Sequence, residues 1–464
     1  MTNPSLDAYQ QVFGMAGLAN RAGGYNGTGT ELQQQLQYDL SYYLSNVPPV
    51  TIMGQTEPST PNSLIPPLLG NWNLVWGPAL IEETDENGKP TGVADNALYV
   101  AQCDAVAFPG GPTLPTYVVA IAATNPSSLY DWETEDFSVA EIVNWTTYDP
   151  FNFTPSPYNG TDPYISKGTA TGIGILLGLT SPDTAASPNT TLQQLLSGLN
   201  PDPDTAIIFC GHSLAGALSP TLALYLKENK NLDAFGVALV YPTAGPTPGE
   251  AAFASLFNTT FPPLPAGWYS QTGDYQSWNT MHWNDLDVVP HAWPKADLEL
   301  IADLYGPSPD KLTAFALDAL QKVAIAEASE SGAAYTRIRN QSLPGQLQKM
   351  DGSVPITIPP QSLYDYVQQL FLQHVTLYSG SPASDNAPAI SGLILQQPLP
   401  QQYPPQLVPG VSLVTKDEMI LKIIQQIIGW ISSHYLADQN QLVNENTGYK
   451  NDEMSINLSG NTNH

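Results

Sequence analysis

The stretch from residue 207 to 226, IIFCGHSLAGALSPTLALYL, constrains the fold more than any other part of this sequence. It begins with a short apolar run that predicts a buried strand, and it ends with the pattern of a buried helix. A turn of small residues around Ser213 joins the two. A strand that passes through such a turn directly into a helix presents the side chain of the turn at the strand end.

Apolar runs on both sides of this stretch predict further strands and helices. The strand-like runs are WNLVWG, ALYVAQCDAVAF, TYVVAIAAT and AFGVALVYPTAG. Helical patterns are found in residues 1–45, in TLQQLLSGL, in residues 310–328 and after Thr415. Because strands alternate with helices, we predict an α/β fold with a mostly parallel central sheet flanked by helices and with extra helical segments at both ends.

Proline-rich segments suggest how the chain is divided. We predict an N-terminal helical segment and connector over residues 1–70, and a core with insertions over residues 71–395. Residues 396–464 are expected to hold a second proline-rich connector, a C-terminal helix and a polar tail. At 464 residues, the chain exceeds what one hydrophobic core usually organises, so additions around a central domain are expected.

Two of the predicted helices carry specific patterns. Thr415-Lys-Asp-Glu418 is a capping-box sequence, and the isoleucines that follow it recur at helical spacing up to Ile431, which is typical of a core-facing stripe. In the helix over residues 310–328, one buried face is predicted from Leu312, Ala316, Leu320, Val323 and Ala326.

The charge of the chain limits its partners. It has 14 Lys and Arg residues against 42 Asp and Glu residues, a net charge of −28. Such a surface repels phosphate backbones, so nucleic acid is not expected as a partner. No apolar run approaches about 18 residues, so no transmembrane segment is predicted.

The sequence leaves the location of the protein open. The scarcity of charged residues, 12% of the chain, slightly favours a secreted protein. The segment MTNPSLDAYQQVFG has neither the basic start nor the apolar core of a secretory signal. The only cysteines, Cys103 and Cys210, exclude a disulfide scaffold and a four-cysteine metal site. Two buried thiols are expected, with one long-range disulfide as the alternative.

Ser213 is the candidate nucleophile. A sharp turn between a strand and a helix exposes the hydroxyl, and the helix that starts after it directs unsatisfied N–H groups and a positive dipole end toward a developing oxyanion. The other interpretation is a serine that only caps the helix. His212 is not expected to act as the base, because adjacent side chains diverge in such a turn.

The segment Gly211-His212-Ser213-Leu214 with its following helix resembles the nucleophile elbow of the class 3 lipases, which have the α/β-hydrolase fold. Three further stretches resemble the same family in the same order: TYVVAIAATN, YPTAGPTPGEAAF and NDLDVVPHAW, with a weaker similarity in YISKGTATGI. The resemblance covers roughly residues 95–380. Two departures are Ala215, where the family has glycine, and AIAATN, which lacks the usual Phe-Arg-Gly.

The resemblance implies a Ser-His-Asp triad of Ser213, Asp287 and His374. A serine nucleophile needs a histidine base, which in turn needs a carboxylate to hold its tautomer. Asp287 directly precedes Val-Val-Pro, as in the family pattern, and Asp285 is the rival. His374, with a tyrosine four residues later, matches the histidine segment of the family loosely. His434 and His291 remain as alternatives for the base.

The resemblance also implies an oxyanion hole and a reaction. The N–H of Leu214 and the hydroxyl of Thr124 are expected to bind the oxyanion. We expect a lipase-like carboxylic ester hydrolase that cleaves acyl esters, such as acylglycerols, through an acyl-enzyme, without metal or cofactor. The alternatives are an esterase for short, aromatic or polymeric esters, a phospholipase, and a binding module that has lost catalysis.

Substrate contacts are predicted around the same site. The substrate is expected to be a lipid or another ester, which the protein could meet at a lipid–water interface. His212, Trp145, Phe151 and Phe153 are the candidate substrate-binding residues, and the aromatic segment 144–165 is the candidate cover or acyl-chain wall. The sequence predicts neither the acyl length nor the oligomeric state.

Overall fold

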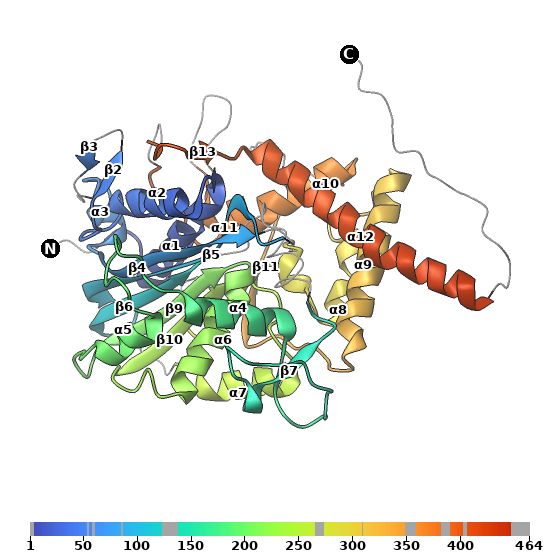
Figure 1. The fold of residues 1–464 in the computed structure, drawn as a ribbon, viewed down its shortest axis with the longest axis horizontal. Helices are drawn as coiled ribbons and strands as arrows, with labels where there is room; N and C mark the ends of the chain where they lie inside the picture. The colour runs from blue at the N-terminus through green and yellow to red at the C-terminus, as the bar shows by residue number, and fades with distance from the viewer. Residues whose placement is uncertain are drawn as a thin grey trace, which may run out of the picture.

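A central sheet organises the chain, with helices on both of its faces and a further group of helices at one side (Figure 1). The computed structural model describes residues 4–52, 55–57, 61–84, 87–122, 138–264, 273–308, 310–348, 359–381, 390–401 and 406–446. The strands are β1 (Tyr25–Asn26), β2 (Val50–Ile52), β3 (Gln55–Glu57), β4 (Asn73–Thr84), β5 (Pro90–Ala107), β6 (Thr113–Ile121), β7 (Ile142–Asn144), β8 (Tyr164–Ser166), β9 (Ala206–His212), β10 (Val237–Thr243), β11 (Met281–Asn284), β12 (Asn340–Leu343) and β13 (Ser412–Leu413).

The helices connect and cover these strands. The α-helices are α1 (Ala8–Ala19), α2 (Gly29–Ser41), α3 (Pro66–Leu69), α4 (Lys167–Gly178), α5 (Leu192–Gly198), α6 (Leu214–Glu228), α7 (Ala251–Thr260), α8 (Lys295–Leu298), α9 (Lys311–Glu330), α10 (Leu363–Phe371), α11 (Leu377–Ser379) and α12 (Lys416–Asn446). Short 3₁₀ segments are η1 (Asn20–Gly24), η3 (Trp145–Thr147), η4 (Val289–His291) and η5 (Ile301–Asp303), and η6 (Leu372–Thr376) is a π-helical turn.

Among the described residues, the main sheet has nine strands, in the order β12-β11-β10-β9-β6-β5-β1-β13, with β4 paired to β5. The strands from β6 to β12 in this order pair in parallel, whereas β4, β5, β1 and β13 add antiparallel pairs. The predicted fold class, an α/β-hydrolase fold with helices around a central sheet, is confirmed.

Strand β9 is buried along its whole length because both faces of the sheet are covered. Ile208 and Cys210 point into the core beneath α1, while Ile207 and Phe209 point into the core beneath α4 and α6. This alternation follows from the two-residue period of a strand. It explains why the sequence shows a continuous apolar run before Ser213.

The chain regions near the two ends meet in the sheet. Helix α1 packs across β9 and β6, and β1 pairs with both β5 and β13. In the β1–β13 pair, Tyr25 lies opposite Leu413. The N-terminal and C-terminal segments therefore share one hydrophobic core with the central strands. The domain boundaries predicted from the sequence remain a prediction.

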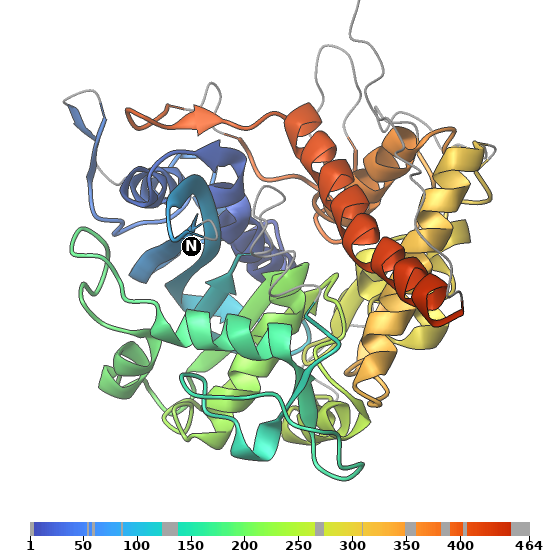
Figure 2. The same ribbon diagram turned by 45° about the vertical axis from the view of Figure 1, so that its right-hand side comes forward.

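Helices α9, α10 and α12 form the group at the side of the sheet, and α12 runs diagonally across the other two (Figures 1 and 2). The predicted capping box of α12 is present, because the Thr415 and Glu418 side chains each accept a hydrogen bond from the other residue's backbone N–H. The predicted buried face of α9 is partly wrong. Leu312 and Ala326 are exposed, and Leu317 and Ala324 are buried instead.

Cys103 and Cys210 are both buried and unbridged, as expected for thiols that serve as small apolar residues. Burial raises the pKa of both thiols. Among the described residues, no helix is long and apolar enough to cross a membrane, and no cluster of three side chains is suited to hold a metal ion.

Candidate active site

Ser213 occupies the sharp turn between β9 and α6. Its φ of 60° lies in a backbone region that residues other than glycine rarely adopt. Its N–H donates a hydrogen bond of 3.1 Å to the carbonyl of Thr243 on the neighbouring strand. Gly211 is required here because a Cβ atom at this position would lie 2.5 Å from Cβ of Ala215. The methyl group of Ala215 therefore fits the elbow because residue 211 has no side chain.

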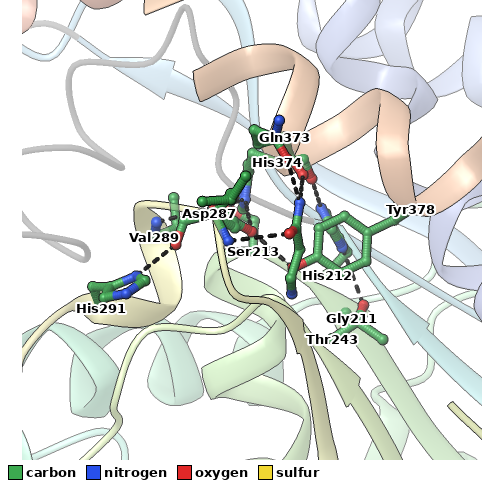
Figure 3. A network of polar contacts seen from close by, with 12 residues as sticks. Gly211, His212, Ser213, Thr243, Asp287, Val289, His291, Gln373, His374 and Tyr378 are labelled. Carbon is green, nitrogen blue, oxygen red and sulfur yellow. Dashed lines mark hydrogen bonds and ion pairs between the residues drawn. The ribbon is translucent and has the colours of Figure 1, made fainter. Parts of the chain in front are cut away.

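Three side chains form a continuous hydrogen-bond chain at this turn (Figure 3). Nε2 of His374 lies 2.7 Å from Oγ of Ser213, and Nδ1 of His374 lies 2.8 Å from Oδ2 of Asp287. A carboxylate only accepts hydrogen bonds, so Nδ1 carries the proton and Nε2 is free to accept from the serine hydroxyl. This is the tautomer that a general base needs.

Asp287 is fully buried and receives two further hydrogen bonds. The backbone N–H of Val289 donates to Oδ1 at 3.1 Å, and the hydroxyl of Tyr378 donates to Oδ2 at 2.9 Å. These donors compensate for the cost of burying a carboxylate. They also fix its plane relative to the His374 ring.

The loop that carries Asp287 is tied to the helical turn that carries His374. The backbone N–H of Asn284 donates to the Tyr378 hydroxyl at 2.6 Å, and its side-chain amide donates to the carbonyl of Gln373 at 3.1 Å and to the Gln373 side chain at 2.7 Å. His374 lies in the π-helical turn η6, a helix form that is frequent at functional sites. These hydrogen bonds therefore hold the loop of Asp287 against the helical turn of His374.

The rival residues have other contacts. Asp285 accepts a hydrogen bond from the N–H of Gly345, and His291 donates through Nδ1 to the backbone carbonyl of Asp287. Neither of these two hydrogen bonds involves Ser213. The side chain of His434 lies outside the described part of the structure. Among the described histidines, His374 is the one that joins Ser213 to a carboxylate.

His212 supports the backbone of His374. Its Nε2 lies 2.7 Å from the carbonyl oxygen of His374, which can only accept, and its Nδ1 lies 3.1 Å from the Thr243 hydroxyl. Burial, together with the nearby His374, lowers the pKa of His212 to about 3, so the ring is neutral at physiological pH. It lines the cavity beside Ser213, and its predicted role in substrate binding remains a prediction.

Buried neutral histidines make stability depend on pH. Burial lowers the pKa of His282 to about 4 from an ordinary 6.5. The unfolded chain therefore binds a proton that the folded chain does not between these values, and stability falls as the pH falls through this window. From pH 7 to pH 4.5, His282 is expected to cost roughly 2 to 3 kcal/mol of unfolding free energy.

Urea unfolding of the wild type and His282→Gln at both pH values measures this effect. The variant removes the titrating ring, so its loss of stability on acidification is expected to be smaller than that of the wild type by about that amount. Equal losses in the two proteins would contradict the assignment of a neutral buried His282.

A cavity of about 310 Å³ opens beside Ser213 and His374. Its walls come from distant parts of the chain: η1, the end of β6, the segment around α8, and helices α9, α10 and α12. Most of the lining side chains are apolar, and the volume lies at the lower end of the range of about 300 to 1,000 Å³ for ligand pockets.

The structure describes one of the two predicted oxyanion donors. The N–H of Leu214 is the first of helix α6, where such groups have no partner within the helix. Thr124 lies outside the described residues. The strand that leads to it, β6, pairs with β9 up to Ile121 opposite Gly211, and Ala122 lines the cavity.

The aromatic residues predicted to bind substrate do not lie at this cavity. Nε1 of Trp145 donates to Glu228 at 2.8 Å, at the far end of α6. A helix of this length places that end about 20 Å from Ser213. Phe153 packs near Tyr148 in the same region, and Phe151 is 65% exposed. The structure does not bring these three residues to the cavity beside Ser213, and their contact with substrate stays a prediction.

Comparison with known proteins relates one segment of this chain to a known family. Residues 138–296 match the family described as Lipase (class 3). This match confirms the predicted resemblance to the class 3 lipases over these residues, and it supports a lipase-type ester hydrolase. The lipase segment contains Ser213 and Asp287, whereas His374 and helices α9, α10 and α12 follow it.

One solved structure supports the fold of this chain. The crystal structure of M37 lipase superimposes with a TM-score of 0.53 at 24% identity, over 80% of this chain and 92% of that protein. A lipase from Rhizopus microsporus var. chinensis matches 48% of this chain and 57% of its own, with 18% identity and a TM-score of 0.27. No match was found among the curated proteins.

Sequence reasoning missed several residues of the site. Tyr378 was recognised only as a neighbour of His374, although a buried tyrosine four residues after a candidate base could have suggested a hydrogen bond to the carboxylate. Asn284 and Thr243 carry no signal in a single sequence, because amide and hydroxyl side chains are frequent in this chain. Ile423 and Ile427 of α12, which the sequence assigns to a core-facing stripe, also line the cavity.

Proposed function

We propose that the protein hydrolyses carboxylic esters of acyl lipids by a Ser-His-Asp mechanism. The observation that carries the proposal is the hydrogen-bond chain from Ser213 through His374 to Asp287, placed at the wall of an apolar cavity. The match to the class 3 lipases supports ester hydrolysis as the reaction.

Acylation begins at Ser213. Its Oγ attacks the ester carbonyl carbon while Nε2 of His374 takes the hydroxyl proton. The carboxylate of Asp287 stabilises the imidazolium that forms. Collapse of the tetrahedral intermediate breaks the bond to the alcohol oxygen, which receives the proton from Nε2, and leaves the acyl group on Ser213.

Deacylation repeats these steps with water. His374 takes a proton from the water molecule, whose oxygen attacks the acyl carbonyl, and returns the proton to Oγ as the fatty acid leaves. The neutral state of His212 is suited to this cycle, because a second positive ring beside the imidazolium would oppose its formation.

The negative charge on the carbonyl oxygen needs donors in both steps. We assign this role to the N–H of Leu214 and to Thr124. The first stands at the positive end of α6, and such a donor is worth about 3 to 4 kcal/mol of transition-state stabilisation. The second follows β6 in the sequence, and the last paired residue of that strand, Ile121, lies opposite Gly211.

Labelling with a fluorophosphonate tests the proposal directly. The wild-type protein is expected to form a covalent adduct at Ser213, while Ser213→Ala is not labelled. Mass spectrometry of the labelled peptide identifies the residue. An adduct at another serine, or no adduct on a folded wild-type protein, would contradict the proposed nucleophile.

Tyr378→Phe tests how Asp287 is positioned. The change removes one hydrogen bond from the carboxylate and leaves the N–H of Asn284 without its buried acceptor. We expect a loss of about 1 to 3 kcal/mol in unfolding free energy and a fall in kcat of about tenfold on nitrophenyl esters. An unchanged kcat would show that Asp287 does not depend on this hydroxyl.

A further inference from the structure

We infer that the apolar cavity beside Ser213 holds the acyl chain of the substrate, and that helix α12 determines how long this chain can be. This inference rests on the proposed function and names the part of the substrate that the site selects. Helix α12 lies outside the segment that matches the lipase family, so this wall belongs to the chain's own C-terminal region.

One face of α12 forms the wall. Met419, Ile423 and Ile427 line the cavity, and their four-residue spacing places them along one side of the helix. Ile423 and Ile427 are buried, whereas Leu421 and Ile428 are 52% and 47% exposed on other sides. Each inward isoleucine therefore contributes to the wall at a different position along α12.

The beginning of α12 is fixed in place. Nζ of Lys416 lies 5.2 Å from the ring centre of Phe371, and the Tyr364 hydroxyl donates to Asp417 at 3.2 Å. The capping box of Thr415 and Glu418 closes the first turn. Because α10 and the first turn of α12 are held together, the wall residues keep a defined distance from His374, which follows α10.

The other walls are suited to hydrocarbon. Leu320 and Ala324 of α9 and Leu370 and Phe371 of α10 face the cavity with α12. Among the described residues that line the cavity, the titratable ones are Asp95, His212 and His374. A charged or strongly polar acyl group would lose its hydration against these apolar walls, so a hydrocarbon chain is the ligand that fits.

A larger side chain on the wall should shorten the accepted chain. Each methylene that loses its place in an apolar site costs a factor of about four in kcat/KM. If the indole of Ile423→Trp displaces three methylenes, the preference for the longest chains over acetate should fall roughly 60-fold. Ile427→Trp should produce the same kind of shift at a different chain length.

The experiment measures kcat/KM for a nitrophenyl ester series from acetate to palmitate. Leu421→Trp is the matched control, with the same new side chain on an exposed position of the same helix. We expect both wall variants to move the optimum toward shorter chains, with a larger loss of kcat/KM for palmitate than for acetate, and the control to keep the wild-type profile. Parallel changes at all chain lengths in folded variants would overturn the inference.

Ile423→Ala gives a test in the opposite direction. It widens the cavity and is expected to shift the optimum toward longer chains, which keeps the inference testable if the indole prevents folding. A wild-type profile in this variant, confirmed as folded by circular dichroism, would count against α12 as the wall. The proposed function fails separately, if the wild-type protein hydrolyses none of these esters.

Discussion

Replacing Ser213 with alanine is expected to lower kcat for nitrophenyl ester hydrolysis by about 10⁵- to 10⁶-fold. The hydroxyl is the atom that forms the acyl-enzyme in the proposed mechanism, and its partner Nε2 of His374 lies 2.7 Å away. The change removes one oxygen atom from a nearly buried site, so the fold should be retained. Steady-state kinetics with circular dichroism as the control measures both effects.

His374→Ala is expected to cause a similar loss. Because the two side chains act as one unit, the double variant should be no slower than either single variant by more than a small factor. Multiplicative losses would show that the two residues act independently. Full activity in Ser213→Ala would place the reaction elsewhere in the molecule.

The second large effect is expected from Asp287→Asn, with a fall in kcat of about 10⁴-fold. An asparagine amide in place of the carboxylate would donate to Nδ1 of His374, which is now 2.8 Å from Oδ2. The ring would then carry its proton on Nε2 and could not accept from Ser213. The geometry would be almost unchanged while the tautomer is wrong.

Asp285→Asn is the matched control for this prediction. Asp285 lies on the same loop and contacts the N–H of Gly345, not His374. We expect it to keep kcat within a few-fold of the wild type. If Asp285→Asn were the damaging variant and Asp287→Asn remained active, the carboxylate assignment would have to be exchanged.

The elbow was predictable because its constraints are local. Gly211 and Ser213 lie within three residues of each other, and the close approach of helix to strand that requires glycine leaves a direct mark in the sequence. The order of strands and helices around it also determines the fold class. The sequence could therefore identify the end of β9 as the place where a reactive side chain is presented.

The aromatic segment lies away from the cavity beside Ser213, and composition does not predict how far a segment lies from a site. Trp145 and Phe153 have the character of a substrate wall, yet they pack at the C-terminal end of α6, against residues such as Phe253. Which end of a helix a loop reaches is decided by tertiary packing. A single sequence carries no direct signal of that choice.

Helical faces show the same limitation. Leu312 at the start of α9 is 75% exposed, although the spacing of apolar residues assigned it to the buried side. The helix has apolar residues around much of its surface, so periodicity alone does not select one face. In α12, Ile423 and Ile427 of the predicted stripe are buried but Ile428 is 47% exposed, and packing and cavity lining have the same pattern in sequence.

The pairing of β1 with β13 also sets an order of events during synthesis. Tyr25 is synthesised nearly four hundred residues before its partner Leu413, which lies immediately before α12. A nascent chain that has already exposed Ser213, Asp287 and His374 still lacks this edge strand and the last wall of the cavity. The three proposed catalytic residues are therefore all synthesised before the cavity that we propose selects the acyl chain is complete.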